Sequence, residues 1–188
     1  PEHEAIILIV GAMGPITSWP DFFCKKLAAN GYFVIKFDNR DMGYSTHFPA
    51  NRPDGKNPLP YSIYDMVEDV HDILQYYTKD KAHIVGHSLG GSIAQLFAIK
   101  YPKKTITLIP ISSPILAKDN LKFVETDQTI LDNMWKVLMS NKMYPDFERG
   151  KDEFMKIWKY LHGNWAVDED MANRYTKRIY ETEVIEPA

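Results

Sequence analysis

The strongest chemical signal in the sequence is a serine bracketed by glycines. Gly86, Ser88 and Gly90 form the pattern Gly-x-Ser-x-Gly, which follows the apolar run 82–85 and precedes a helix-forming segment that ends near Tyr101. This order predicts a strand, a sharp turn and a helix, with the Ser88 hydroxyl raised at the amino end of the helix. Glycines suit such a turn because backbone segments approach each other where a Cβ atom would clash. We interpret Ser88 as a candidate nucleophile rather than an ordinary helix cap.

Patterns for cofactor or metal chemistry do not compete with this signal. The segment Gly11-Ala12-Met13-Gly14 lacks the Gly-x-Gly-x-x-Gly spacing of a dinucleotide site, and Gly90-Gly91 lacks the lysine of a phosphate-binding loop. No cluster of metal-ligand residues stands out, and the single cysteine, Cys24, reads as a buried, inert thiol. We therefore expect neither a metal nor an organic cofactor.

Composition and charge favour a protein that acts on small molecules. The 188 residues are 45% hydrophobic and 25% charged, which is ordinary for a globular domain, and the formal net charge is −3. Such a charge offers no basic field for nucleic acid or an anionic membrane, and no apolar run approaches the length of a membrane span. With no secretory leader visible at the start, we expect a cytoplasmic location.

The first part of the chain alternates strand and helix signals. Buried strands are predicted over 5–10, 32–37, 82–85 and 105–111, and helices over 20–31, over 62–77 and up to Tyr101. This alternation predicts an α/β fold with a parallel, doubly wound sheet. The segment after 37 is a long polar loop, in which Asp38, Asn39 and Arg40 are expected to form local hydrogen bonds and ion pairs.

The pattern changes after Ser113. Strand signals stop, and helices are predicted over 128–141, 146–162 and 168–183. We therefore expect two parts, a core over 1–113 and a helical cap over 114–188. The cap is rich in aromatic and methionine residues, including Met134, Trp135 and Trp158. These side chains either pack the layer itself or form a lid over a bulky apolar substrate.

Several segments together resemble one known family. They are 8–11 with Ser18-Trp19-Pro20, the stretch 31–46, the serine turn, and in the cap Trp158, Gly163, 168–170 and Arg174-Tyr175. On these residues the chain resembles the α/β-hydrolase superfamily, and within it the aclacinomycin-methylesterase-like branch. The resemblance covers nearly the whole chain. It implies a serine hydrolase without a cofactor.

The resemblance also implies a strand order and an oxyanion hole. Strands 5–10 and 82–85 would be neighbours, so that the turn at Gly11 faces Ser88 across a topological switch point. Two backbone N–H groups would then stabilise the negative oxygen of a tetrahedral intermediate. The family pattern assigns them to Leu89 and Ala12, with Met13 as the alternative, because the usual histidine before Gly11 is absent. A simple tight turn is the competing interpretation.

The resemblance leaves the base and acid of a serine triad unassigned. In the family both follow the cap, whereas this sequence stops at Ala188, so we expect an internal piece of a larger hydrolase with an incomplete core. His87 adjoins the serine on a sharp turn and His83 lies toward the wrong end of the sheet, as does His3. His71 and His162 are expected at the surface of helices, and His47 remains only a remote alternative.

The leading prediction is a carboxylic-ester hydrolase that forms an acyl-enzyme on Ser88 and acts on a small apolar ester-like substrate. The triad acid and histidine would lie outside this chain, in a missing segment or a second chain that completes the sheet. One alternative uses the same site for perhydrolase chemistry or carbon–carbon bond hydrolysis. The other is an inactive fragment or binding module that keeps the fold without a complete triad, because an open four-stranded sheet leaves an apolar edge to be covered.

Overall fold

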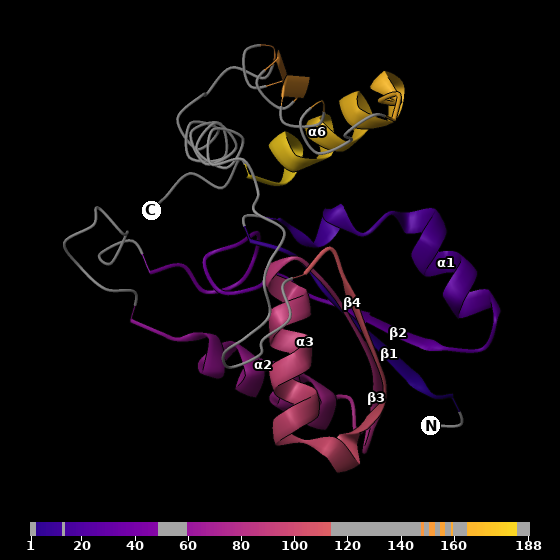
Figure 1. Ribbon diagram of the computed structural model, residues 1–188, viewed down its shortest axis with the longest axis vertical. Helices are drawn as coiled ribbons and strands as arrows, with labels where there is room; N and C mark the ends of the chain where they lie inside the picture. The colour runs from indigo at the N-terminus through magenta and orange to yellow at the C-terminus, as the bar shows by residue number, and fades with distance from the viewer. Residues whose placement is uncertain are drawn as a thin grey trace. The chain divides into compact units, whose positions relative to one another are not determined.

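The computed structural model describes residues 3–12, 14–48, 60–113, 148, 151–152, 155–156, 159 and 165–183. Within these residues the strands are β1 (Ala5–Ile9), β2 (Phe33–Lys36), β3 (Ala82–His87) and β4 (Thr105–Ile111). They pair in parallel in the order β2-β1-β3-β4, as Figure 1 shows. The parallel sheet and the strand order predicted from the sequence are confirmed.

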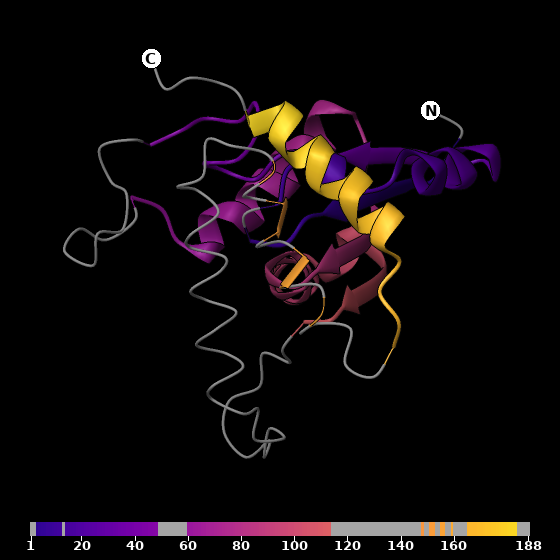
Figure 2. The same cartoon turned by 90° about the horizontal axis from the view of Figure 1, so that it is seen from above.

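Helices cover both faces of this sheet (Figures 1 and 2). They are α1 (Asp21–Ala29), α2 (Ile63–Tyr76) and α3 (Leu89–Lys100), with short 3₁₀ turns η1 (Ile16–Ser18) and η3 (Pro102–Lys104). Alternate residues of β1 point to opposite sides, so Ile6 and Leu8 pack with residues of α1, while Ile7 and Ile9 pack with those of α2 and α3. Two apolar clusters result, and the predicted doubly wound architecture is confirmed.

The second helix illustrates how local sequence sets these elements. Ser62 and Asp65 form a capping box, in which the Asp65 carboxylate accepts the backbone N–H of Ser62 at 2.7 Å. The buried residues of α2 recur at helical spacing and are Met66, Val67, Val70 and Leu74. One stripe of the helix therefore packs on the sheet, as the spacing predicted.

Two strands are less buried than the sequence predicted. Of β2 only Ile35 is buried, and Phe33 is exposed. Most of β4 is exposed as well, including Leu108, Ile109 and Ile111. Both strands end the described sheet, so helices and neighbouring strands cover them incompletely, whereas the central strand β1 is fully buried.

The chain divides into two compact units, Pro1–Leu116 with Ile185–Ala188, and Ala117–Val184. In the second unit, α6 (Glu169–Glu183) begins where the Asp168 carboxylate accepts the N–H of Met171 at 2.9 Å. The helix predicted over 168–183 is thereby confirmed. The helix predicted over 128–141 lies outside the described residues, as does most of the one over 146–162. Among the described residues no helix is long and apolar enough to cross a membrane.

Candidate active site

Ser88 alone joins β3 to α3, and its backbone is strained. Its φ of 53° and ψ of −119° lie in a region that residues with side chains rarely adopt. Three backbone hydrogen bonds hold the turn: Ser88 donates its N–H to Ile111 O at 2.9 Å, and its carbonyl accepts the N–H groups of Gly91 at 2.9 Å and of Ser92 at 3.2 Å. The half-buried Ser88 is thus presented at the amino end of α3, as the sequence pattern predicted.

Three glycines allow this turn because, without a side chain, they let other atoms approach closely. A Cβ atom on Gly86 would lie less than 3.0 Å from Gly90, and one on Gly90 less than 3.0 Å from Ile9 and Val10. A Cβ atom on Gly91 would collide with the side chain of Ser113. At each of these positions the serine turn requires close packing that a side chain would prevent, and glycine permits it.

The loop after β1 lies directly beside Ser88. A Cβ atom on Gly11 would stand 3.1 Å from the Cβ of Ser88 and 3.1 Å from Nδ1 of His87. The loop itself is a tight turn, closed by the N–H of Gly14 and the carbonyl of Gly11 at 3.2 Å. Leu89 opens α3, where backbone N–H groups have no acceptor within the helix. Met13 lies outside the described residues.

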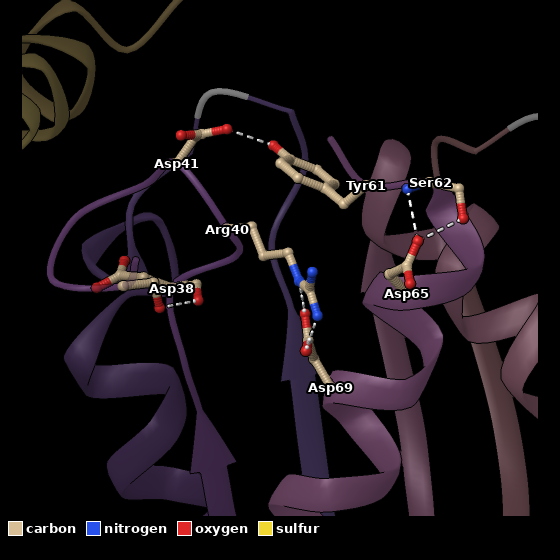
Figure 3. A network of polar contacts seen from close by, with 8 residues as sticks. Asp38, Arg40, Asp41, Tyr61, Ser62, Asp65 and Asp69 are labelled. Carbon is tan, nitrogen blue, oxygen red and sulfur yellow. Dashed lines mark hydrogen bonds and ion pairs between the residues drawn. The ribbon is translucent and has the colours of Figure 1, made fainter. Parts of the chain in front are cut away.

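The long loop after β2 is held by charged side chains (Figure 3). Arg40 makes a two-pronged ion pair with Asp69 of α2, at 2.7 and 2.8 Å. Asp41 accepts the Tyr61 hydroxyl at 2.6 Å, and burial together with this bond raises the pKa of Tyr61. The Asp38 carboxylate accepts the N–H of Ile16 in η1. The local contacts expected of this loop are found at Asp38, whose carboxylate accepts the Tyr44 N–H and whose carbonyl accepts the Ser45 hydroxyl. Arg40 was also expected to bond locally, but its ion pair reaches α2 instead.

None of the described histidines hydrogen-bonds to Ser88. His47 bonds to the carbonyl of Gly43 at 2.9 Å, and His83 to Thr107 Oγ1 at 2.8 Å. His71 stacks on Tyr101, with the ring centroids 4.6 Å apart. The His87 ring lies against Gly11, and burial lowers the pKa of that imidazole. The described residues therefore contain a candidate nucleophile without its base.

Other features of the described surface do not converge on Ser88. A concave region of about 680 Å³ lies along β2, lined among others by Phe37, Arg40 and Asp69, and none of its lining residues belongs to the serine turn. No group of three or more metal-ligating side chains gathers within the described part of the chain. Cys24 is half-buried rather than buried as predicted, and its partial burial raises the pKa of the thiol.

The structure brings together Ser88, Leu89 and the loop that carries Ala12, but the predicted lid residues Met134, Trp135 and Trp158 lie outside the described residues. Sequence reasoning missed two contacts of this site. Asn39 donates through Nδ2 to the carbonyl of Val10 at 3.1 Å, and Ser113 packs on Gly91. Neither partner is near in sequence, so no spacing rule could have revealed them.

The amino-acid sequence is similar to those of known hydrolases. The family model "alpha/beta hydrolase fold" matches residues 4–152. Rhodomycin D methylesterase DauP of Streptomyces sp. (strain C5) is 36% identical over 108 residues, which are 57% of this chain and 34% of DauP. The rhodomycin D methylesterase DnrP of Streptomyces peucetius is 36% identical over 110 residues, again 57% of this chain and 34% of that protein. The chain thus spans about a third of the length of these methylesterases.

Solved structures share the fold at low identity. A marine microorganism esterase superposes with a TM-score of 0.61 at 18% identity, covering 95% of this chain and 60% of the esterase. The hydrolase BphD of Rhodococcus sp. strain RHA1 gives a TM-score of 0.62 at 17% identity, covering 97% of this chain and 58% of BphD. These likenesses show the fold, and the sequence matches to the family model and to DauP and DnrP confirm the predicted resemblance: the chain belongs to the alpha/beta hydrolase fold family.

Proposed function

We propose that this chain carries the nucleophile and the oxyanion hole of a serine hydrolase that cleaves carboxylic esters. The Ser88 Oγ attacks the ester carbonyl carbon, the alcohol leaves with a proton, and water then releases the acid from the acyl-enzyme. The N–H groups of Leu89 and Ala12, with Met13 as the alternative to Ala12, stabilise the negative oxygen of each tetrahedral intermediate. The strained backbone of Ser88, directly beside the Gly11 loop, is the observation that carries this proposal.

The base and acid of the triad are proposed to lie outside this chain, in a further segment or a second chain. Two observations support this. No described histidine reaches Ser88, and the apolar side chains of β4 are exposed at 38% for Leu108, 47% for Ile109 and 39% for Ile111. An added strand would cover these side chains and bring its own loop to the carboxyl edge of the sheet.

The substrate is proposed to be a small apolar ester-like molecule, met in the cytoplasm. The names of DauP and DnrP, both methylesterases, support ester cleavage over the perhydrolase and carbon–carbon alternatives. Met134, Trp135 and Trp158 would cover the substrate as part of a helical lid over 114–188. A panel of methyl esters and vinylogous diketones separates the reactions, because only the esters should be turned over.

Labelling with a fluorophosphonate, carried out on the protein together with the segment or second chain that supplies the base and acid, tests the nucleophile. We expect one adduct per protein on the peptide that contains Ser88, and no adduct on the Ser88→Ala variant, whose backbone carries a similar strain. Ser92 offers a control, because it is the buried serine nearest along the chain, and Ser92→Ala should keep the label. Binding of an apolar ester without labelling or turnover would contradict the proposal and favour a binding module.

A further inference from the structure

Two neighbouring residues after β2 hold the two ends of the Gly11 loop. Asn39 Nδ2 donates to the carbonyl of Val10, just before the loop, at 3.1 Å. The Asp38 carboxylate accepts the N–H of Ile16, just after it. Both ends of the short loop that carries Ala12 are therefore hydrogen-bonded to the neighbouring residues Asp38 and Asn39.

The bond from Asn39 is buried and can form in one way only. Asn39 is 5% exposed and Val10 is 1% exposed, so water does not compete for either group. A carbonyl oxygen can only accept, which means that the amide nitrogen of Asn39, and not its oxygen, must face Val10. The bond thus fixes the peptide plane between Val10 and Gly11.

The same carbonyl oxygen also contacts the serine turn. A Cβ atom on Gly90 would stand 2.6 Å from Val10 O, so the backbone of α3 packs directly on this peptide. The Val10 carbonyl consequently lies between the amide of Asn39 and the first turn of α3.

Asn39 is itself held on a rigid loop. The Ser45 hydroxyl donates to Asp38 O at 2.6 Å, and the N–H of Tyr44 donates to the Asp38 carboxylate at 3.1 Å. Asp38, the residue before Asn39, is therefore also anchored within its own loop. The Asn39 side-chain amide is thus held in place by its own loop as well as by the bond to Val10.

We propose that Asn39 is a positioning residue that sets the distance between the two halves of the oxyanion hole through the Val10 carbonyl. It does not touch the substrate. The inference rests on the proposed function, because it assigns the Gly11 loop a role in stabilising an oxyanion. Hydrogen-bond donors of this kind work only when they are preorganised, and displacements near 1 Å can cost about 100-fold in rate.

The test compares Asn39→Leu, which keeps the approximate shape but has no donor, with Asn39→Ala and with the control Asp69→Asn. The control weakens the neighbouring Arg40 ion pair of the same loop and leaves Val10 untouched. The rate of Ser88 phosphonylation is measured against fluorophosphonate concentration, with the segment or chain that supplies the base and acid present. This separates the maximal rate from the half-saturating concentration. Hydrogen exchange of the peptide 10–16 and thermal melts accompany it.

For both Asn39 variants we expect a maximal rate lower by about 10- to 100-fold, a half-saturating concentration within about twofold of wild type, and faster exchange in 10–16. Asp69→Asn should label within about twofold of wild type. If either Asn39 variant does not fold, the other decides.

Wild-type labelling with unchanged rates in the Asn39 variants would overturn the role of Asn39 and leave the proposed function standing. Equal slowing in Asp69→Asn would also overturn it, because the effect would then be general damage to the loop. A wild-type protein that is not labelled at Ser88 would instead contradict the proposed function, and the catalytic role of Asn39 with it.

Discussion

The serine turn and the loop after β2 are built in opposite ways. The turn from Gly86 to Gly91 depends on close packing of backbone, where three glycines leave no room for a methyl group. The loop that begins at Asp38 depends on side chains, which bond to η1, to Val10 just after β1, and to α2. Figure 3 shows several of these side chains reaching from the loop to α2 and its preceding residues.

The comparison teaches that the two regions should differ in what they tolerate. A steric contact with fixed backbone cannot relax without moving a strand or a helix, so adding one carbon there is costly. A hydrogen-bonded loop loses one bond at a time and keeps its other anchors. Substitutions in the two regions can therefore be ranked by expected effect.

The largest effect is expected for Gly90→Ala. The new methyl group would lie within 3.0 Å of the carbonyls of Ile9 and Val10, both in or beside the central strand. We expect a loss of about 4 kcal/mol or more in the free energy of unfolding, measured by urea denaturation. Gly31→Ala is the control, because its φ is +87° but the nearest atom is 4.0 Å away, so only about 1–2 kcal/mol should be lost. Equal losses would show that packing is not what distinguishes the turn.

A smaller effect is expected in the loop for Asp38→Asn. The buried carboxylate accepts N–H groups from Ile16 and from Tyr44, and an amide can accept only on its oxygen. One N–H is left facing another donor, so we expect a loss of about 2–3 kcal/mol in a urea melt. The exposed Asp72→Asn should stay within about 0.5 kcal/mol of wild type. A loss as large as that of Gly90→Ala would contradict the ranking.

The different construction of the serine turn and of the loop after β2 explains which features could be predicted from the sequence. The serine turn was predicted because glycine spacing records its backbone packing, and the strand order followed from the family resemblance. The anchoring of the loop was predicted only as local contacts, because Asp38 and Asn39 bond to partners that folding alone brings near. The exposure of β2 and β4 was missed because apolar periodicity does not show which strand ends a sheet.

Backbone strain at Ser88 should give a third, smaller effect. Glycine adopts positive φ freely, whereas alanine at position 88 would have the same backbone strain as serine. Relief of about 1–3 kcal/mol of strain, offset by the greater freedom of glycine in the unfolded chain, should make Ser88→Gly more stable than Ser88→Ala by about 1 kcal/mol. Paired thermal melts measure this difference. A less stable glycine variant would mean that the turn stores no strain.

The smallest effect is expected at the start of α2, for Asp65→Asn. Hydrogen bonds from Ser62 lower the pKa of the Asp65 carboxyl, so its stabilising contribution is present above its unfolded pKa and is lost as the pH falls through the lower, folded value. The variant should therefore melt slightly below wild type at pH 7, and the two melting temperatures should converge in acid, once the pH lies below the folded pKa of Asp65. A gap that persists in acid would show that charge is not the cause.

The most direct test of the central claim is a crystal structure of the phosphonylated protein. The account predicts a covalent bond from phosphorus to Ser88 Oγ, with the phosphonyl oxygen within about 3.1 Å of the backbone nitrogens of Leu89 and Ala12, or of Met13 in place of Ala12. An adduct on another residue, or a phosphonyl oxygen that contacts neither the start of α3 nor the Gly11 loop, would contradict it.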